Sequence, residues 1–251
     1  MERSRDGLRQ DGLKMRQTLG LANDLHGDLS PGYRGMADEL VFGGIWSRPN
    51  LGLGERMISV LCVLSARERH THLDAYVGSA LHIGLAPRAV QEVLIHAGLY
   101  AGFVTSESAL AIANEVFAQH GVSPEETDIL NGDFEAAGEE LKVALHGARS
   151  AKGYADPDHP TTGDLYWLAT TYGYGALWNR PGLSRRDRFV CAVATFTTID
   201  HHGQLQKFIE SGLAELERQE VIEIIMQTAP YSGFPRALNA LAVAAEVLPA
   251  A

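Results

Sequence analysis

Hydrophobic residues recur along most of this chain at the three- and four-residue spacing of an amphipathic α-helix. No stretch shows the sustained alternation of apolar and polar residues that is typical of a half-buried β-strand. Residues 58–64 are apolar almost all round, which predicts a buried central helix. The pattern therefore predicts an all-α fold.

The predicted helices form two series with the same order. The first series is Leu8–Leu19, Tyr33–Ile45, Leu53–Leu64, Glu68–Ile83, Ala89–Ala101 and Glu107–His120. The second series is Phe134–Leu145, Leu165–Leu177, Ser184–Phe196, Asp200–Leu213, Leu216–Tyr231 and Pro235–Val247. Residues 122–128 read as a linker between the series, and the turn-rich residues 153–163 as a loop.

The same polar and aromatic motif occurs twice, 131 or 132 residues apart. Each copy has a Trp-x-Arg-Pro turn, an Arg ten residues after the Trp, an acid followed four residues later by His or Gln, and Glu-x-x-x-His/Gln-x-x-x-Tyr-x-Gly-Phe. The first copy contains Trp46, Arg48, Arg56, Glu68, His72, Glu92, His96 and Tyr100. The second contains Trp178, Arg180, Arg188, Asp200, Gln204, Glu223, Gln227 and Tyr231. Solenoid periods run at roughly 20 to 50 residues, so one long period predicts two closely packed copies of a helical domain.

The copies differ at the residue four positions after each acid. His72 and His96 of the first copy are replaced by Gln204 and Gln227 in the second. A glutamine forms hydrogen bonds but does not titrate near neutral pH, whereas an imidazole does. We therefore expect proton chemistry in the first half of the chain.

Helical spacing brings these groups together in pairs. Residues four apart share a helix face, so we expect Glu68 beside His72, and Glu92, His96 and Tyr100 along one polar strip. A carboxylate next to an imidazole fixes its tautomer and raises its pKa, which prepares a general acid or base. We predict that both pairs face one cavity. The alternative is that each is a solvated surface pair.

The remaining candidates allow two interpretations each. Arg48 and Arg56, which follow Trp46 at fixed spacing, suit the binding of a substrate carboxylate, or they bond backbone carbonyls and hold the Trp turn in place. His70 points to a different side of its helix from His72, either at the flank of the pocket or at the surface. In the second copy His201 and His202 are secondary candidates of the same kind.

The composition of the chain limits the kinds of molecule that it is expected to bind. The formal net charge is −10, which argues against nucleic acid, because phosphate binding depends on Lys and Arg. No apolar window of about 18 residues or secretory signal is apparent, so we expect no membrane association and a cytoplasmic location. Cys62 and Cys191 lie in apolar stretches and are expected to be buried thiols. The ligand that remains is a small molecule.

Neither a metal nor an organic cofactor is expected. Di-iron helical bundles use Glu-x-x-His with spacing three, whereas both acid–histidine pairs here have spacing four. The zinc-binding HExxH motif, GxSxG, GxGxxG and the phosphate-binding P-loop are absent from the sequence.

The order of the repeated motif resembles the carboxymuconolactone decarboxylase family, which belongs to the all-helical superfamily of alkylhydroperoxidase D. The resemblance runs through the chain twice, from the opening segment at 12–20 to the closing one at 231–235. It implies two tandem alkylhydroperoxidase D-like repeats packed as a pseudo-dimer, with residues 1–121 as the first and 122–251 as the second, partly degenerate repeat. Single-repeat members are typically hexamers, so a tandem chain implies a homotrimer.

The resemblance also implies an activity. The decarboxylase branch acts without metal or organic cofactor on a carboxylated butenolide, so a cofactor-free decarboxylase of a small carboxylated lactone or related cyclic metabolite is expected. By resemblance His72 is the acid/base residue and Glu68 orients it, with Glu92, His96 and Tyr100 lining the same cavity. The alternatives are a cofactor-free isomerase or cyclase and a non-catalytic helical ligand-binding protein.

Two departures from the family pattern affect these expectations. The peroxidase branch carries a CxxC before the family histidine, and Ser65 and Glu68 occupy those positions here, so thiol redox chemistry is not expected. Val104 replaces the proline that follows Gly-Phe in the family. The second copy also lacks the histidines. The extended loops and the tandem form favour a substrate other than the standard lactone.

Overall fold

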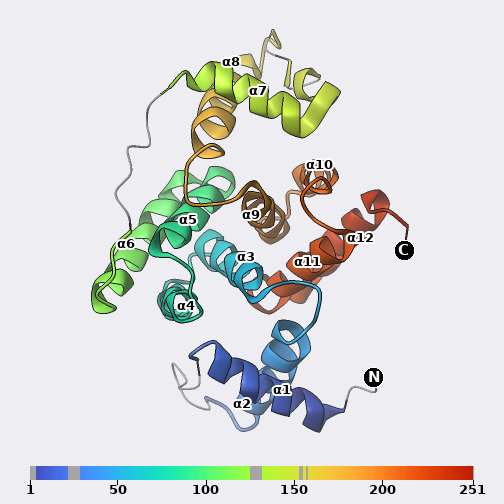
Figure 1. Ribbon diagram of the computed structural model, residues 1–251. Helices are drawn as coiled ribbons and strands as arrows, with labels where there is room; N and C mark the ends of the chain where they lie inside the picture. Colours follow the sequence, from blue (N-terminus) through green and yellow to red (C-terminus); the bar gives the residue numbers. More distant parts are fainter. Residues whose placement is uncertain (1–3, 22–28, 125–131, 153–154, 157, 251) are drawn as a thin grey trace.

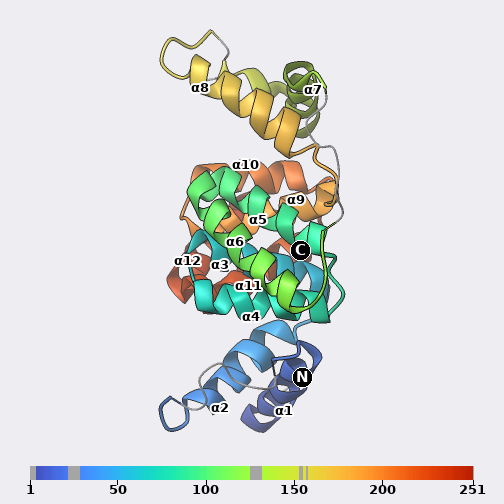
Figure 2. The same cartoon turned by 90° about the vertical axis from the view of Figure 1, so that its left-hand side faces the viewer.

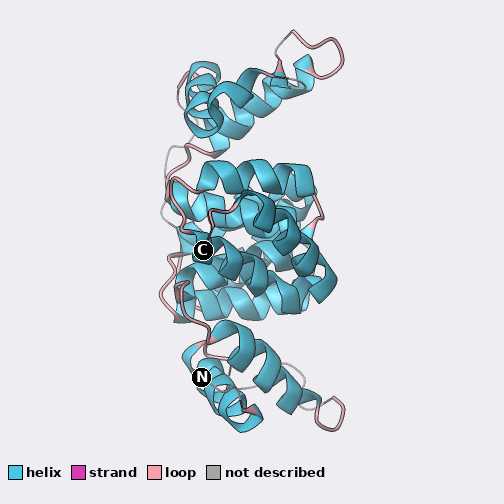
Figure 3. Cartoon of the chain, turned by 90° about the vertical axis from the view of Figure 1, so that its right-hand side faces the viewer, coloured by secondary structure: helices cyan, strands magenta, loops and turns pink. Residues whose placement is uncertain are grey.

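The computed structural model describes residues 4–21, 29–124, 132–152, 155–156 and 158–250. Every regular element in these ranges is a helix and none is a strand, which confirms the predicted all-α class (Figure 3). Part of the predicted linker, residues 125–128, and positions 153, 154 and 157 of the predicted loop lie outside the described residues. None of the described helices is long and apolar enough to cross a membrane.

Two buried helices form the centre of the molecule (Figure 1). They are α3 (Leu53–Ala66) and α9 (Arg185–Thr198), which pack against each other. From Arg56 to Ser65 and from Arg188 to Thr198 every residue is buried, as the apolar character of these segments predicts. Both predicted thiols, Cys62 and Cys191, are free and lie fully buried in this pair.

Three further helices from each half surround the central pair (Figure 1). In the first half they are α4 (His70–His82), α5 (Pro87–Ala101) and α6 (Phe103–Gln119). In the second half they are α10 (His202–Gly212), α11 (Arg218–Ser232) and α12 (Phe234–Val247). Gly102 (φ 117°) and Gly233 (φ 103°) end α5 and α11 in a backbone region that favours glycine, which explains the glycine of the Tyr-x-Gly-Phe motif.

A helical hairpin lies at each end of this body (Figure 2). At the N-terminal end, α1 (Arg5–Thr18) packs against the π-helix η1 (Asp38–Trp46), which continues α2 (Tyr33–Ala37). At the other end, α7 (Phe134–His146), which leads into the 3₁₀-helix η2 (Gly147–Ala151), packs against the π-helix η4 (Ala169–Leu177), which continues α8 (Gly163–Leu168).

The two hairpins use glycine in the same way. A Cβ on Gly12 would lie 2.0 Å from the Asp38 carbonyl oxygen, and one on Gly138 would lie 2.3 Å from that of Thr170. Side chains at these positions would force the helices apart, so both glycines are required by close approach.

Several predicted helix starts are wrong, among them Asp200, which precedes α10 with φ 58°, and Glu107, since α6 begins at Phe103. The one at Glu68 matters for the site. Helix α4 begins at His70, and Glu68 lies before it in the left-handed region, with φ 52°. The Glu68 and Arg69 N–H groups donate to the carbonyls of Ser65 and Leu64, which closes α3 with a Schellman-type cap. Glu68 therefore does not share a helix face with His72, because it terminates the preceding helix.

Candidate functional site

The polar strip of α5 meets the second half of the chain. Glu92 is fully buried, and both of its carboxylate oxygens accept from Arg180 Nε at 3.0 Å. Arg188, itself 1% exposed, brings Nη2 to 3.6 Å from Glu92 Oε2. A buried carboxylate needs such compensation, because an unpaired charge in the interior is costly. The first half thus contributes the acid and one arginine, Arg88, whose Nη2 lies 2.6 Å from Glu92 Oε1, and the second half contributes Arg180 and Arg188.

His96 lies on the same strip and is also fully buried. Its Nδ1 is 3.2 Å from Arg188 Nη1, and a guanidinium can only donate, so Nδ1 accepts. Burial and the charge of Arg188 hold the pKa of His96 well below its usual value, so the ring is neutral. A neutral ring with an accepting Nδ1 carries its proton on Nε2, which then donates to the Tyr100 hydroxyl at 3.3 Å.

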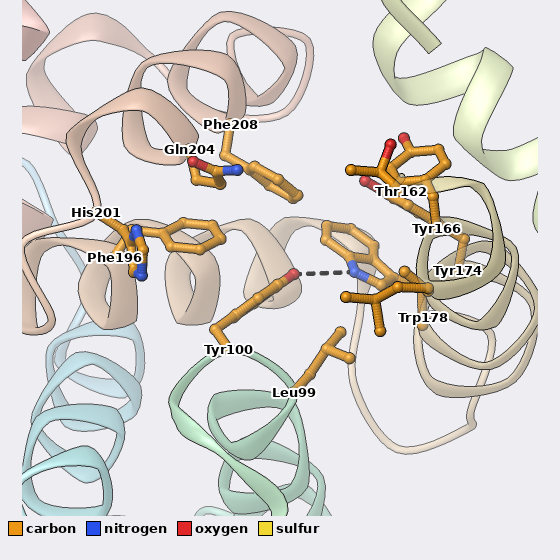
Figure 4. Close-up of a pocket in the computed structure, with 13 residues that line it drawn as sticks. Leu99, Tyr100, Thr162, Tyr166, Tyr174, Trp178, Phe196, His201, Gln204 and Phe208 are labelled. Atoms are coloured by element: carbon orange, nitrogen blue, oxygen red, sulfur yellow. Dashed lines mark hydrogen bonds between the residues drawn. The ribbon is translucent and has the colours of Figure 1, made fainter. Parts of the chain in front are cut away.

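The Tyr100 hydroxyl receives a second donor. Trp178 Nε1 donates to it at 3.0 Å (Figure 4). Burial, the largest cause, raises the pKa of Tyr100 well above its usual value, so the group stays protonated at neutral pH. Because its oxygen already accepts from Trp178 and His96, the hydroxyl hydrogen is left to donate elsewhere.

The hydroxyl of Tyr100 lies on the wall of a cavity of about 410 Å³ between helices of the two halves (Figure 4). The lining residues are Leu99, Tyr100, Thr162, Leu165, Tyr166, Ala169, Gly173, Tyr174, Trp178, Phe196, His201, Gln204 and Phe208. Aromatic rings dominate this set, and neither lysine nor arginine is among the described residues that line the cavity. A cavity of this kind suits the ring of a small organic molecule. We call this cavity and its backing residues Glu92, His96, Arg180 and Arg188 the Tyr100 site.

The second copy of the motif makes a matching arrangement, which we call the Tyr231 site: Trp46, Arg48, Arg56, Tyr76, Glu223, Gln227 and Tyr231. Arg48 Nη2 lies 2.7 Å from Glu223 Oε1. Trp46 Nε1 donates to the Tyr231 hydroxyl at 2.7 Å. Here, however, the Tyr231 hydroxyl also bonds to the hydroxyl of Tyr76, at 2.7 Å. Tyr76 is 6% exposed, and Tyr231 is partly buried.

The structure separates residues that the sequence placed in one cavity. Glu92, His96 and Tyr100 form the predicted strip, but Trp46, Arg48 and Arg56 lie in the Tyr231 site, with the acid of the other copy. The substrate-binding role predicted for Trp46, Arg48 and Arg56 stays a prediction. They lie apart from the strip of the first copy because each Trp–Arg turn crosses to the opposite half.

The arginines also hold the Trp turns, as the second interpretation of them predicts. Arg56 Nη2 donates to the carbonyls of Arg48 and Pro49, at 2.9 and 3.2 Å. In the other copy, Arg188 Nη2 donates to the carbonyl of Arg180. Each guanidinium thus joins a turn of one half to the polar strip of the other.

Glu68, His70 and His72 are exposed, and none of them lines the cavity of the Tyr100 site. Gln204, the counterpart of His72, does line it, together with His201. The roles predicted for Glu68, His70 and His72 stay predictions.

Sequence reasoning missed several residues of the site. Trp178, Arg180 and Arg188 complete the polar strip of the first half, and the repeated Trp–Arg motif was the available signal for them. Phe196, Phe208 and Tyr174 carry no motif and become visible only through the fold. Across the described ranges, no group of three or more His, Cys, Asp or Glu side chains is placed to hold a metal ion.

Comparison with known proteins agrees with this architecture. Residues 163–246, which include Trp178, Arg180 and Arg188, match the model of the carboxymuconolactone decarboxylase family. The 4-carboxymuconolactone decarboxylase of Acinetobacter baylyi is 29% identical over 101 residues, which cover 40% of this chain and 75% of that protein. The resemblance predicted from the motif is thereby confirmed for residues 163–246, which match the carboxymuconolactone decarboxylase family.

Proposed function

We propose that the Tyr100 site is the active centre of a cofactor-free carboxy-lyase that acts on a small cyclic compound, a carboxylated lactone or a related ketone. The observation that carries this proposal is the Tyr100 hydroxyl, which accepts two hydrogen bonds and has its own hydrogen left for the cavity. Similarity to a protein named 4-carboxymuconolactone decarboxylase supports the reaction class.

The chemistry follows from this one donor. When the bond between the ring carbon and the carboxylate breaks, CO₂ leaves and the electron pair delocalises into the ring carbonyl as an enolate. Tyr100 donates its hydrogen bond to the carbonyl oxygen, where the negative charge develops. The enolate carbon then takes a proton from a general acid, for which His201, an exposed imidazole on the cavity wall, is the candidate.

The site is built so that Tyr100 needs no rearrangement during the reaction. Arg188 fixes the tautomer of His96, and Trp178 and His96 hold the phenol oxygen from two sides. A donor that is already oriented in a water-poor site stabilises a developing oxyanion far more than water does, and losing one such donor costs roughly 10²- to 10³-fold in kcat.

A second function is favoured by the lining of the cavity. Without a lysine or arginine among the described lining residues, the cavity suits an uncharged ring as well as a carboxylate. The same Tyr100 donor would then stabilise an enolate formed by proton removal, and the enzyme would be an isomerase or cyclase without loss of CO₂.

The test compares Tyr100→Phe with the matched control Tyr231→Phe. Each change removes the acceptor of one tryptophan N–H, so the structural costs are similar. We expect release of CO₂ from 4-carboxymuconolactone or a bulkier carboxylated lactone to fall about 100-fold or more in Tyr100→Phe and less than threefold in Tyr231→Phe.

The possible results separate the functions. No CO₂ release by the wild type, together with solvent deuterium incorporation into an uncharged cyclic ketone, would favour the isomerase. Equal activity of the two variants would contradict any role of Tyr100. Binding without either reaction would indicate a ligand-binding protein.

A further inference from the structure

A second, smaller hollow adjoins the cavity of the Tyr100 site. It measures about 50 Å³, and Tyr166, Tyr174 and Phe208 line both spaces. Its other walls come from α7, η2 and the adjoining loop, and from Lys207 of α10. The three shared side chains set the two spaces next to each other.

The two spaces differ in charge. The cavity has no cationic residue among its described lining residues, whereas Arg149, Lys152 and Lys207 all line the hollow. Glu210 pairs with Arg149. Of the two spaces, only the hollow has cationic side chains among its described lining residues.

His146, which lines the hollow, is affected by two of the same cationic side chains. Its Nδ1 lies 2.8 Å from Ser211 Oγ and its Nε2 lies 2.9 Å from the Tyr174 hydroxyl, so the ring is held between α10 and η4. Burial, and then the charges of Arg149 and Lys207, lower the pKa of His146 to about 4. The ring is neutral at pH 7, and the charges acting on it are positive.

The size of the hollow limits what it can hold. One water molecule takes about 30 Å³ of liquid, so about 50 Å³ accommodates a group as small as a carboxylate. We propose that the hollow binds a carboxylate of a ligand whose ring lies in the cavity, so that the substrate class is an aromatic or polycyclic acid that retains this anion. The proposal rests on the proposed function in one respect, that the cavity is the substrate site.

The retained carboxylate is not the group that leaves as CO₂. A carboxylate held by Arg149, Lys152 and Lys207 is stabilised in its charged form, which opposes loss of that charge. The reacting bond belongs in the uncharged cavity beside Tyr100. The two spaces thus assign an anchoring end and a reacting end to one substrate.

The experiment uses 2-naphthoate and its methyl ester, which share a ring and differ in charge. Binding to the full-length chain is measured by isothermal titration calorimetry at low salt. We expect the acid to bind at least fivefold more tightly than the ester, and this preference to shrink in 0.5 M salt because the hollow opens near exposed residues.

Variants localise the effect. Lys207→Gln and Lys152→Gln should each weaken the binding of 2-naphthoate about fivefold and leave the ester unchanged, while Lys14→Gln, an equal change of charge on the exposed surface of α1, should affect neither. Circular dichroism establishes that the variants are folded.

Each failure has a distinct meaning. Equal binding of acid and ester, or an equal effect of Lys14→Gln, would overturn the anion subsite while leaving the cavity as a ring site. Failure of both ligands to bind would overturn the subsite, and the kinetic comparison of Tyr100→Phe with Tyr231→Phe then decides separately whether the cavity is the site of reaction.

Discussion

The Tyr100 site and the Tyr231 site share a framework of ion pairs and a tryptophan–tyrosine hydrogen bond, and they differ in what lies next to the tyrosine hydroxyl. In both, a buried glutamate of one half pairs with arginines of the other, and a tryptophan donates to a tyrosine hydroxyl. At Tyr231 the hydroxyl bonds to Tyr76, whereas the counterpart of Tyr76 is Phe208, which has no hydroxyl to offer Tyr100. The ion pairs and tryptophan bonds thus join the halves in both sites. In the proposed function, reactivity depends on the Tyr100 hydroxyl, whose hydrogen has no partner among the described residues.

The largest expected effect tests whether the framework is equivalent in the two sites. Glu92→Ala and Glu223→Ala each leave buried arginines without their counter-charge, so each should lower the free energy of unfolding by about 3–5 kcal/mol in urea titrations. Glu107→Ala, an exposed position on α6, is the control. A large loss from one glutamate alone would show that the two frameworks are not equivalent.

The next effect belongs to the second half, where His146 has no histidine counterpart. Its pKa is lowered from 6.5 to about 4 by burial and by Arg149 and Lys207. Between these values the unfolded chain binds more protons than the folded one, so stability falls as pH drops from 6.5 to about 4, by at most about 3 kcal/mol. Acid titrations of stability should become flatter in His146→Gln. An unchanged slope would mean that this ring is not held neutral.

His96→Gln gives the Tyr100 site the amide of its counterpart. The amide oxygen of Gln227 accepts from Arg56 at 2.9 Å, but its nitrogen makes no hydrogen bond within the described structure. A glutamine at 96 should therefore keep the arginine contact and lose the donor to Tyr100, so kcat falls about tenfold with KM little changed. His72→Gln is the comparison, with an expected change below threefold. A larger loss from His72→Gln would instead support the catalytic role predicted for that residue.

The smallest effect concerns the hydroxyl that closes the Tyr231 site. Tyr76→Phe removes the partner of Tyr231 and should cost about 1 kcal/mol of unfolding free energy. The double variant Tyr76→Phe/Tyr231→Phe should be less destabilised than the sum of the single variants, because both remove the same hydrogen bond. Additive losses would contradict the direct pair.

Much of the fold was predictable because helical periodicity, and glycines that end helices, are local features of the sequence. The ends of α5 and α11 follow from Gly102 and Gly233, and the buried centre from the apolar run in α3. Glu68 was misplaced because an acid is an uncommon residue in the left-handed conformation that closes a helix.

The site was only partly predictable. The strip Glu92, His96 and Tyr100 follows from spacing along one helix. Its pairing with Trp178 and Arg188 does not, because spacing along the chain carries no information about which copy a turn faces. The cavity lies where the second copy has Phe208 at the position that Tyr76 occupies in the first. Neither residue belongs to the repeated motif, so this difference became informative only when the two sites were compared in the structure.

The exchange of arginines between halves has a consequence for how the chain unfolds. Separated from its neighbour, the first half would keep only Arg88 as a partner for Glu92, and the second would have Glu223 without Arg48 and Arg56. Separation would also expose the buried face that α3 and α9 share, so neither half is expected to be a stable body by itself. A chain that carries two copies of one motif should therefore melt in a single cooperative transition, with neither copy surviving the loss of the other.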